Sequence, residues 1–245
     1  MDVGLSHTAE ALSVPAAKRI SGFYGKLPAH GDFIDRGLPV GFINGWDQWL
    51  QQSVSASREQ YGESWLDIYL TSPIWRFALT AGVIDNRAWA GILVPSVDRV
   101  GRYFPITIAM PLAADERPAT FLAENEDLFS HWEQVALQAL QESLVADEVD
   151  ERLVRAVEAL KPANGVAFNR NSLIRGVAQP DDRGNGWARM VDAGLSLHDD
   201  SFSLWRCAGS ANMPPMMLFK KGLPEPRSFT AMLSGQWQAC DWDAP

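Results

Sequence analysis

Hydrophobic residues recur at helical spacing directly after Pro39, and this pattern predicts the first long helix of the chain. Proline is favoured at the start of a helix, and intervals of three and four residues place apolar side chains on one face. Polar residues at positions 47, 48, 51 and 52 occupy the other side of this helix. The predicted apolar stripe consists of Phe42, Ile43, Trp46, Trp49, Leu50 and Val54.

Alternating hydrophobic positions predict strands on either side of a turn-rich link. Residues 74–80 (IWRFALT) place Trp75, Phe77 and Leu79 on one face, and residues 88–94 (AWAGILV) follow as a second strand. The pair is typical of an antiparallel hairpin with a longer loop. Further strands are expected at 22–27, 103–110, 202–207 and 216–220. Pro105 cannot donate a backbone hydrogen bond, so it belongs near a strand start or at a sheet edge.

Helical spacing returns in the second half of the chain. It continues through residues 120–145, a second helix is marked by Val149, Leu153, Val157 and Leu160, and residues 227–234 should form a short terminal helix. Residues 163–200 give no clear pattern. Blocks of strands and helices predict an α/β fold with a mixed sheet, antiparallel at its heart, and helices on its faces.

Composition and charge narrow the classes of protein. Hydrophobic residues make up 47% of the 245 positions, enough for a large core, and the net charge of −9 argues against binding to nucleic acid or an anionic membrane. Residues 1–20 resemble a flexible tail without a signal peptide, and residues 21–245 are expected to form one domain with a possible subdivision near 112–165. No stretch is apolar enough to span a membrane, which predicts a cytoplasmic protein. Cys207 and Cys240 are expected to be reduced core thiols.

The stretch GFYGKLPAHGDFIDRGLP, residues 22–39, combines glycines with ionisable side chains and is the first candidate site. Gly25-Lys26 matches the end of a phosphate-binding P-loop, but the first glycine of that motif falls on Ile20, and Leu27 replaces its Ser or Thr. A metal site on His30 and Asp32 would need further ligands, and His131 and His198 are the only other histidines outside the tail. A nucleophilic triad of Ser96, His30 and Asp98 has the right residue types but no nucleophile elbow.

A structural interpretation fits the same stretch better. Gly25, Gly31 and Gly37 can adopt positive φ. The side chains of Asp32 and Asp35 can accept backbone N–H bonds in turns, and Arg36 could pair with one of these carboxylates. These features predict a rigid, irregular loop.

A second cluster, VPSVDRVGRYFPITIA at residues 94–109, joins two apolar strands. Gly101 permits a tight reversal, and Asp98 could brace the loop by pairing with an arginine. Arg99 and Arg102, if they point outward, suit the docking of an acidic or phosphorylated partner, because a guanidinium group binds such groups bidentately.

These two clusters carry a family resemblance. Together with WDQWL (46–50), SPIWRFAL (72–79), SLWR (203–206) and GLPEPRSF (222–229), they resemble the TagF family, also called ImpM, of accessory proteins of the bacterial type VI secretion system. The resemblance is strong over residues 22–112 and looser beyond. It implies a three-layer α/β/α domain without catalysis or cofactor. It further implies a cytoplasmic, post-translational repressor of secretion-system assembly or firing that binds the system's forkhead-domain scaffold protein.

The resemblance also indicates which residues matter. The positions that match its motifs and that we expect to bind the partner are Lys26, Asp32, Phe33, Arg36, Ser96, Asp98, Arg99 and Arg102. Two alternatives remain at this stage. One is a metal-dependent hydrolase or phosphatase that uses Asp32, His30 and Asp98, and the other is a crevice that senses a small molecule or a phosphopeptide.

Overall fold

A computed structural model describes residues 21–157, 186–198 and 200–240. Its centre is a seven-stranded sheet with the order β2-β1-β5-β4-β3-β6-β7. The strands are β1 (Gly22–Gly25), β2 (Ile34–Arg36), β3 (Trp75–Leu79), β4 (Trp89–Val94), β5 (Ile106–Pro111), β6 (Phe202–Cys207) and β7 (Met216–Lys221). Every pairing between these strands is antiparallel, so the sheet is not mixed within the described residues.

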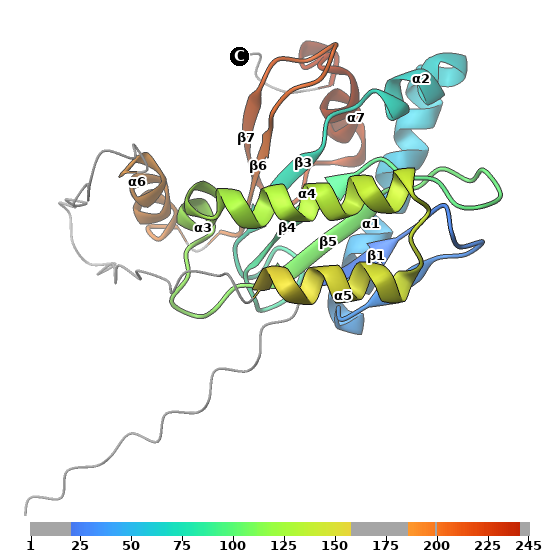
Figure 1. Cartoon of the computed structure of the whole chain (residues 1–245). Helices are drawn as coiled ribbons and strands as arrows, with labels where there is room; N and C mark the ends of the chain where they lie inside the picture. The colour runs from blue at the N-terminus through green and yellow to red at the C-terminus, as the bar shows by residue number, and fades with distance from the viewer. Residues whose placement is uncertain (1–20, 158–185, 199, 241–245) are drawn as a thin grey trace, which may run out of the picture.

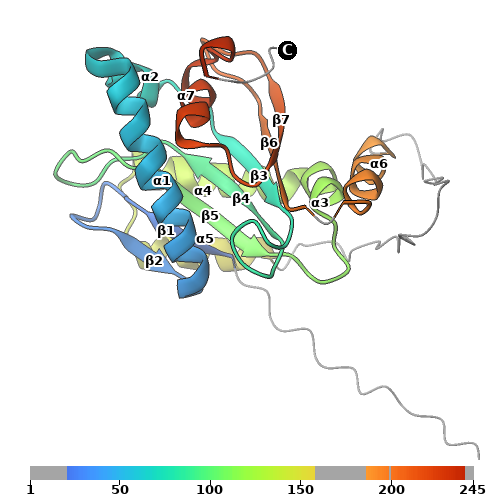
Figure 2. The same cartoon turned by 180° about the vertical axis from the view of Figure 1, so that it is seen from behind.

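Helices cover both faces of the sheet, which gives the predicted α/β/α sandwich (Figures 1 and 2). One face carries α1 (Val40–Tyr61), α2 (Trp65–Leu70) and α7 (Pro226–Ser234). The other carries α3 (Pro118–Glu124), α4 (Glu126–Gln141) and α5 (Ala146–Val157), and α6 (Gly186–Leu195) packs against α3. Two short 3-10 turns, η1 (Gly62–Ser64) and η2 (Gln238–Cys240), complete the described elements.

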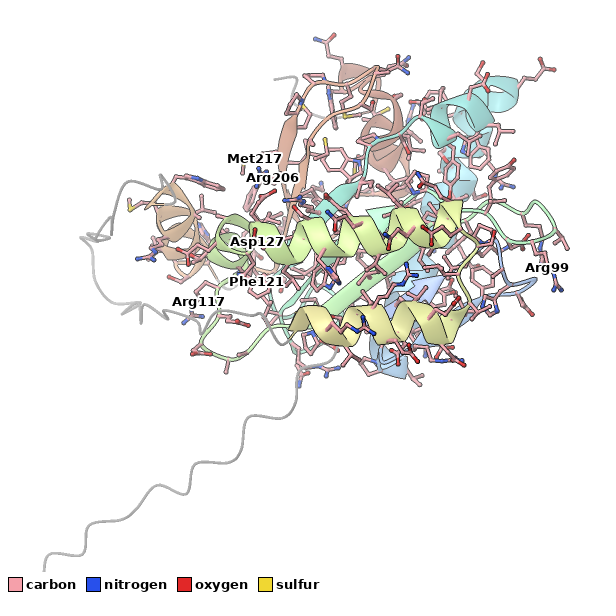
Figure 3. The ribbon with its side chains drawn as sticks, viewed as in Figure 1. Arg99, Arg117, Phe121, Asp127, Arg206 and Met217 are labelled. Atoms are coloured by element: carbon pink, nitrogen blue, oxygen red, sulfur yellow. The ribbon has the colours of Figure 1, made fainter. Side chains whose placement is uncertain are left out.

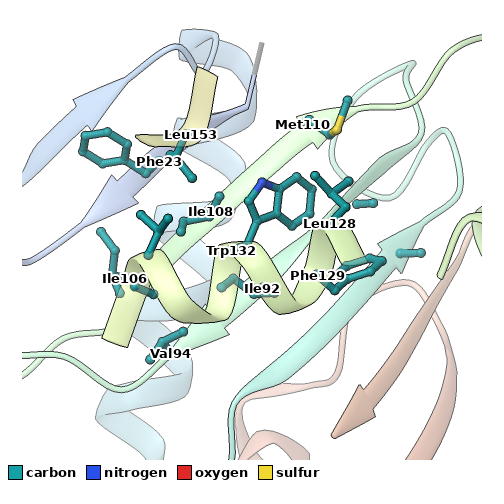
Figure 4. Close-up of a cluster of buried hydrophobic side chains, with 14 of the residues drawn as sticks. Phe23, Ile92, Val94, Ile106, Ile108, Met110, Leu128, Phe129, Trp132 and Leu153 are labelled. Atoms are coloured by element: carbon teal, nitrogen blue, oxygen red, sulfur yellow. The ribbon is translucent and has the colours of Figure 1, made fainter. Parts of the chain in front are cut away.

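Each side of the sheet has its own hydrophobic core. Beneath α4 and α5, Trp132 lies among aliphatic side chains of β4 and β5, including Ile92, Ile108 and Met110 (Figure 4). Its indole N–H has no hydrogen-bond partner within the described part of the chain. Apolar burial alone therefore holds this ring in place.

The opposite core is aromatic and its indoles are hydrogen-bonded. The Trp46 Nε1–H donates to Thr107 Oγ1 at 2.8 Å, and the Trp49 Nε1–H donates to the carbonyl of Pro224 at 2.7 Å. Buried indoles need such partners because an unpaired N–H loses its bond to water. Helix α1 is thereby fixed both to the sheet and to the segment that leads into α7.

Much of the predicted secondary structure is confirmed. The β3–β4 pair is antiparallel, β5 begins directly after Pro105, and the stripe after Pro39 becomes the inner side of α1, with Ile43 only partly buried. Cys207 and Cys240 are free and buried. The expected tail, residues 1–20, lies outside the described residues.

Three predictions need correction. The expected helix over 120–145 is two helices that meet at Asn125, whose φ of −106° and ψ of 43° interrupt helical geometry. The strand expected at 103–110 begins only at Ile106. Elements β2, α2 and α6 were not expected, and α6 occupies part of the unclear stretch 163–200.

Two connections define the region of interest. The loop between β1 and β2 and the loop between β4 and β5 project from the same end of the sheet (Figure 1), since β1 pairs with β5. No helix within the described ranges is both long and apolar enough to cross a membrane.

Candidate functional site

Two loops that the sequence singles out separately form one surface, which we call the two-loop platform. It comprises residues 26–33 after β1 and residues 95–105 between β4 and β5. Two hydrogen bonds to backbone carbonyls join them: the Arg99 amide donates to the carbonyl of His30 at 2.8 Å, and the Ser96 side-chain hydroxyl donates to the carbonyl of Lys26 at 2.6 Å. The platform is therefore a tertiary structure made by residues about 70 positions apart in the chain.

An ionic cluster centred on a buried carboxylate, Asp98, fixes the shape of the platform. The Lys26 ammonium donates to Asp98 Oδ2 at 2.9 Å, and Arg102 Nε donates to the same oxygen at 2.6 Å. The other Asp98 oxygen accepts the backbone N–H groups of Val100 and Arg102. Because every one of these donors points at one carboxylate, Asp98 holds the turn of the second loop and ties it to the first.

The electrostatic setting of Asp98 follows from these contacts. Burial by itself would raise the pKa of this carboxyl group, because desolvation penalises the charged form. The hydrogen bonds from Arg102, Lys26 and Val100 outweigh burial and hold the pKa of Asp98 well below its usual range. Asp98 is accordingly charged at neutral pH, as its two cationic partners require.

Tyr69 of α2 supports the base of the second loop. Its hydroxyl donates to the carbonyl of Ser96 at 3.0 Å and accepts the Ser96 N–H at 2.9 Å. Burial raises the pKa of the Tyr69 phenol above its ordinary value, so the hydroxyl stays protonated and can act as donor and acceptor together.

Close backbone approach explains one of the glycines. At the end of β1, Gly25 has a φ of +140°, and a Cβ there would lie 2.1 Å from the carbonyl oxygen of Pro105. Only glycine fits this junction between the two loops. Gly37 also has positive φ as predicted, whereas Gly31 does not, so the prediction for Gly31 is wrong.

Helix α5 closes the outer side of the first loop. The Ala146 N–H donates to His30 Nε2 at 3.0 Å, and the Arg36 guanidinium lies 3.4 Å from the Asp147 carboxylate. Arg36 also donates to the backbone oxygen of Asp35, so the predicted pairing of Arg36 with the Asp32 or Asp35 carboxylate does not form. The predicted backbone contact of Asp32 is confirmed, since its carboxylate accepts the Phe33 N–H.

The structure separates the predicted partner-binding residues into two groups. Lys26, Ser96 and Asp98 are buried, and they can act on a partner only by holding the shape of the platform. Asp32, Phe33, Arg36, Arg99 and Arg102 are exposed. Arg99 points away from the body of the protein at the tip of its loop (Figure 3). Asp32, Phe33, Arg99 and Arg102 belong to the platform, whereas Arg36 ends β2 and pairs with Phe23 on β1.

Phe33 is the apolar element of this exposed set. It is 42% exposed, its ring stacks on Tyr24 with centroids 5.8 Å apart, and the Lys26 ammonium lies 4.9 Å from its centre. Half-exposed aromatic rings that are held rigidly from below are typical anchors of protein interfaces.

The alternatives with catalytic chemistry find no matching geometry. Among the described residues, no group of three or more His, Cys, Asp or Glu side chains could hold a metal ion. The Asp98 carboxylate accepts hydrogen bonds from four donors, and the Asp32 carboxylate accepts the amide N–H of its neighbour Phe33. The Ser96 hydroxyl donates to a carbonyl and His30 accepts from α5, so the proposed triad is not formed either.

Sequence reasoning missed two contacts of the site, and one of them involves a residue, Tyr69, that it had not singled out. It anticipated the pairing of Asp98 with an arginine, and Arg102 is that partner. It did not foresee that Lys26 reaches the same carboxylate, nor that Tyr69 holds Ser96. The only available signal was that both loops were dense in charged residues and followed strands.

Comparisons with known proteins show the family to which the chain belongs. A family model described as the TagF N-terminal domain, type VI secretion system-associated, matches residues 22–156, more than half of the chain and both loops of the platform. The chain is similar to the crystal structure of PA0076 from Pseudomonas aeruginosa PAO1, with 33% sequence identity and a TM-score of 0.72, over 88% of this chain and 94% of that one. No curated protein matches. The chain therefore belongs to the TagF family of proteins associated with the type VI secretion system.

Proposed function

We propose that this protein is a non-catalytic, cytoplasmic regulator of the type VI secretion system that represses assembly or firing by binding the system's forkhead-domain scaffold protein through the two-loop platform. The observation that carries the proposal is the ionic cluster of buried Lys26 and Asp98 with exposed Arg102, whose charges pair with one another and fix the shape of the two loops. A reacting group would have to be free to meet a substrate, and these groups are not.

The platform has the composition of a docking face. It offers a rigid aromatic ring at Phe33 and an arginine at Arg99, and aromatic and arginine side chains dominate the energetics of protein interfaces. Little ordering entropy is lost on binding, because the ionic cluster around Asp98 holds both loops before the partner arrives.

Repression by binding has a thermodynamic condition. The protein must bind the inactive arrangement of its partner more tightly than the active one, since equal affinity for both would shift no equilibrium. Binding to the scaffold alone and to the assembled system should therefore differ in affinity.

Titration of the purified protein against the forkhead-domain scaffold tests the proposal. We expect a complex of fixed stoichiometry, seen as a single species in size-exclusion chromatography with light scattering. In bacteria, removal of the protein should raise secretion, and its return should lower it. Absence of a complex at concentrations on the order of tens of micromolar would contradict the proposal.

A further inference from the structure

A groove with a cavity volume of about 420 Å³ lies beside the two-loop platform, between its second loop and the end of α1. We call it the Arg58 groove. Only Arg102 is shared with the residues predicted from sequence. The groove is lined by Arg58, Gly62, Trp65, Leu66, Gly101, Arg102 and Tyr103.

The floor of the groove is aromatic and firmly held. The Trp65 indole N–H donates to Ser57 Oγ at 2.8 Å, and its ring stacks on Tyr69 with centroids 4.8 Å apart. The Tyr103 ring meets Trp65 edge-on at 6.2 Å. Trp65 is itself buried, so the apolar surface open to a ligand is that of the half-buried Leu66 and Tyr103 side chains above it.

The groove concentrates positive charge in a chain whose net charge is −9. None of its lining residues is acidic. Arg102 is already compensated by Asp98 at 2.6 Å, whereas no carboxylate of the described residues pairs with Arg58. The Arg58 guanidinium lies 4.2 Å from the Trp65 ring centre and donates one N–H to the carbonyl of Tyr103 at 3.2 Å. One uncompensated cation therefore stands above an aromatic floor.

Both rims of the groove are open. Gly62 and Gly101 have positive φ, and a Cβ at either position would meet no atom within 4 Å. An extended segment of another chain can pass between them without a steric clash with side chains at these two points.

We propose that the Arg58 groove binds an acidic segment of a protein partner, in which one Asp or Glu carboxylate pairs with Arg58 and an adjacent apolar side chain contacts Leu66 and Tyr103. This proposal rests on the proposed docking function, and it specifies the partner segment as one that carries an acidic residue next to an apolar residue. A single free cation matches the single charge of a carboxylate, whereas a phosphate group at pH 7 carries up to two charges and usually meets a cluster of arginines.

A peptide titration tests binding to the Arg58 groove in the absence of the scaffold protein. A negative result would therefore overturn the groove proposal alone, and scaffold binding would still be tested separately. The probe is a short capped peptide of alternating glutamate and leucine, followed by NMR through the indole N–H of Trp65 in the full chain. We expect saturable shifts at Trp65. The same peptide with glutamine in place of glutamate should bind about two- to fivefold more weakly, and Arg58→Gln should weaken the glutamate peptide by the same factor.

Two controls complete the design. Arg58→Lys keeps the charge and should retain most of the binding, and Arg155→Gln on α5, which packs on the opposite face of the sheet, should leave it unchanged. The proposal is overturned if the glutamate peptide causes no shift at Trp65, if glutamate and glutamine peptides bind equally, or if Arg58→Gln binds like the wild type. A phosphoserine peptide that binds more than about tenfold tighter than the glutamate peptide would reassign the groove to phosphate.

Discussion

The Nζ atom of Lys26 lies 2.9 Å from Oδ2 of Asp98, and both side chains are buried although they come from different loops. Breaking a buried ion pair by removing one charge leaves the other uncompensated, which costs more than the pair contributes. Substitution of either residue of this pair should therefore destabilise the two-loop platform.

Asp98→Asn should lower the free energy of unfolding by about 3 kcal/mol or more, because it leaves the Lys26 ammonium buried without a counter-charge. Urea denaturation measures the change. Asp32→Asn is the matched control, since Asp32 is exposed and, among the described residues, accepts its neighbour's amide alone. Its free energy of unfolding should stay within about 0.5 kcal/mol of the wild type. A loss below about 1 kcal/mol for Asp98→Asn would mean that the cluster does not fix the platform.

The lowered pKa of Asp98 predicts a pH dependence with a definite sign. In the unfolded chain this carboxyl group titrates near its ordinary pKa of about 3.9, and in the folded protein it titrates lower. Its contribution to stability is therefore complete above about pH 5 and is lost as the pH falls below about 4 towards the folded pKa. Unfolding free energies measured between neutral and acidic pH should fall less steeply for Asp98→Asn than for the wild type.

Other carboxyl groups contribute to the acid response of both proteins. The pKa values of Asp85, Glu126 and Glu225 are also lowered by their hydrogen-bonding partners despite burial. Only the difference between the wild type and Asp98→Asn belongs to Asp98. Equal acid slopes in the two proteins would show that the Asp98 carboxylate is not stabilised by folding.

Two buried tryptophans should respond differently to the same substitution. Trp132→Phe removes an indole N–H that has no partner among the described residues. Trp46→Phe removes the N–H that donates to Thr107, so the buried hydroxyl of Thr107 loses this hydrogen bond. Both variants lose ring volume, so Trp46→Phe should be the more destabilising by about 1 kcal/mol or more. Thermal unfolding of the two variants makes the comparison, and the reverse order would contradict these hydrogen-bond assignments.

The junction at Gly25 predicts a strong steric effect. Gly25→Ala should destabilise by more than about 2 kcal/mol, because the new Cβ would meet the carbonyl oxygen of Pro105 and the backbone φ disfavours alanine. Gly41→Ala, at the start of α1, is the control: a Cβ there meets no atom within 4 Å, and alanine favours the helix. Equal melting temperatures for Gly25→Ala and Gly41→Ala would contradict the close approach of the two loops at this junction.

The sequence predicted the regular helices and strands because an element with one buried face carries apolar residues at a regular spacing. The α1 stripe and the β3–β4 hairpin followed from spacing alone. The break at Asn125 did not, since the apolar positions on either side keep helical spacing while the backbone changes direction. Strand β2 escaped notice because three residues inside a glycine-rich loop show no alternation.

The candidate site could be predicted only in part. The charged residues of each loop were visible, but their pairing joins positions 26 and 98, and no local period encodes a contact across that separation. For the same reason exposure could not be assigned: Asp98 and Arg99 are neighbours in the sequence, yet one is buried and the other is exposed.

The most direct test of the account is the affinity of the forkhead-domain scaffold for Arg99→Glu, measured by calorimetry beside the wild type and Arg155→Glu. Arg99 is exposed on the platform and Arg155 on α5, and neither has a carboxylate partner in the described part of the chain, so both variants should unfold like the wild type. We predict that Arg99→Glu weakens the complex about tenfold or more, while Arg155→Glu leaves it unchanged. Equal affinity of the scaffold for Arg99→Glu and the wild type would contradict docking through the two-loop platform.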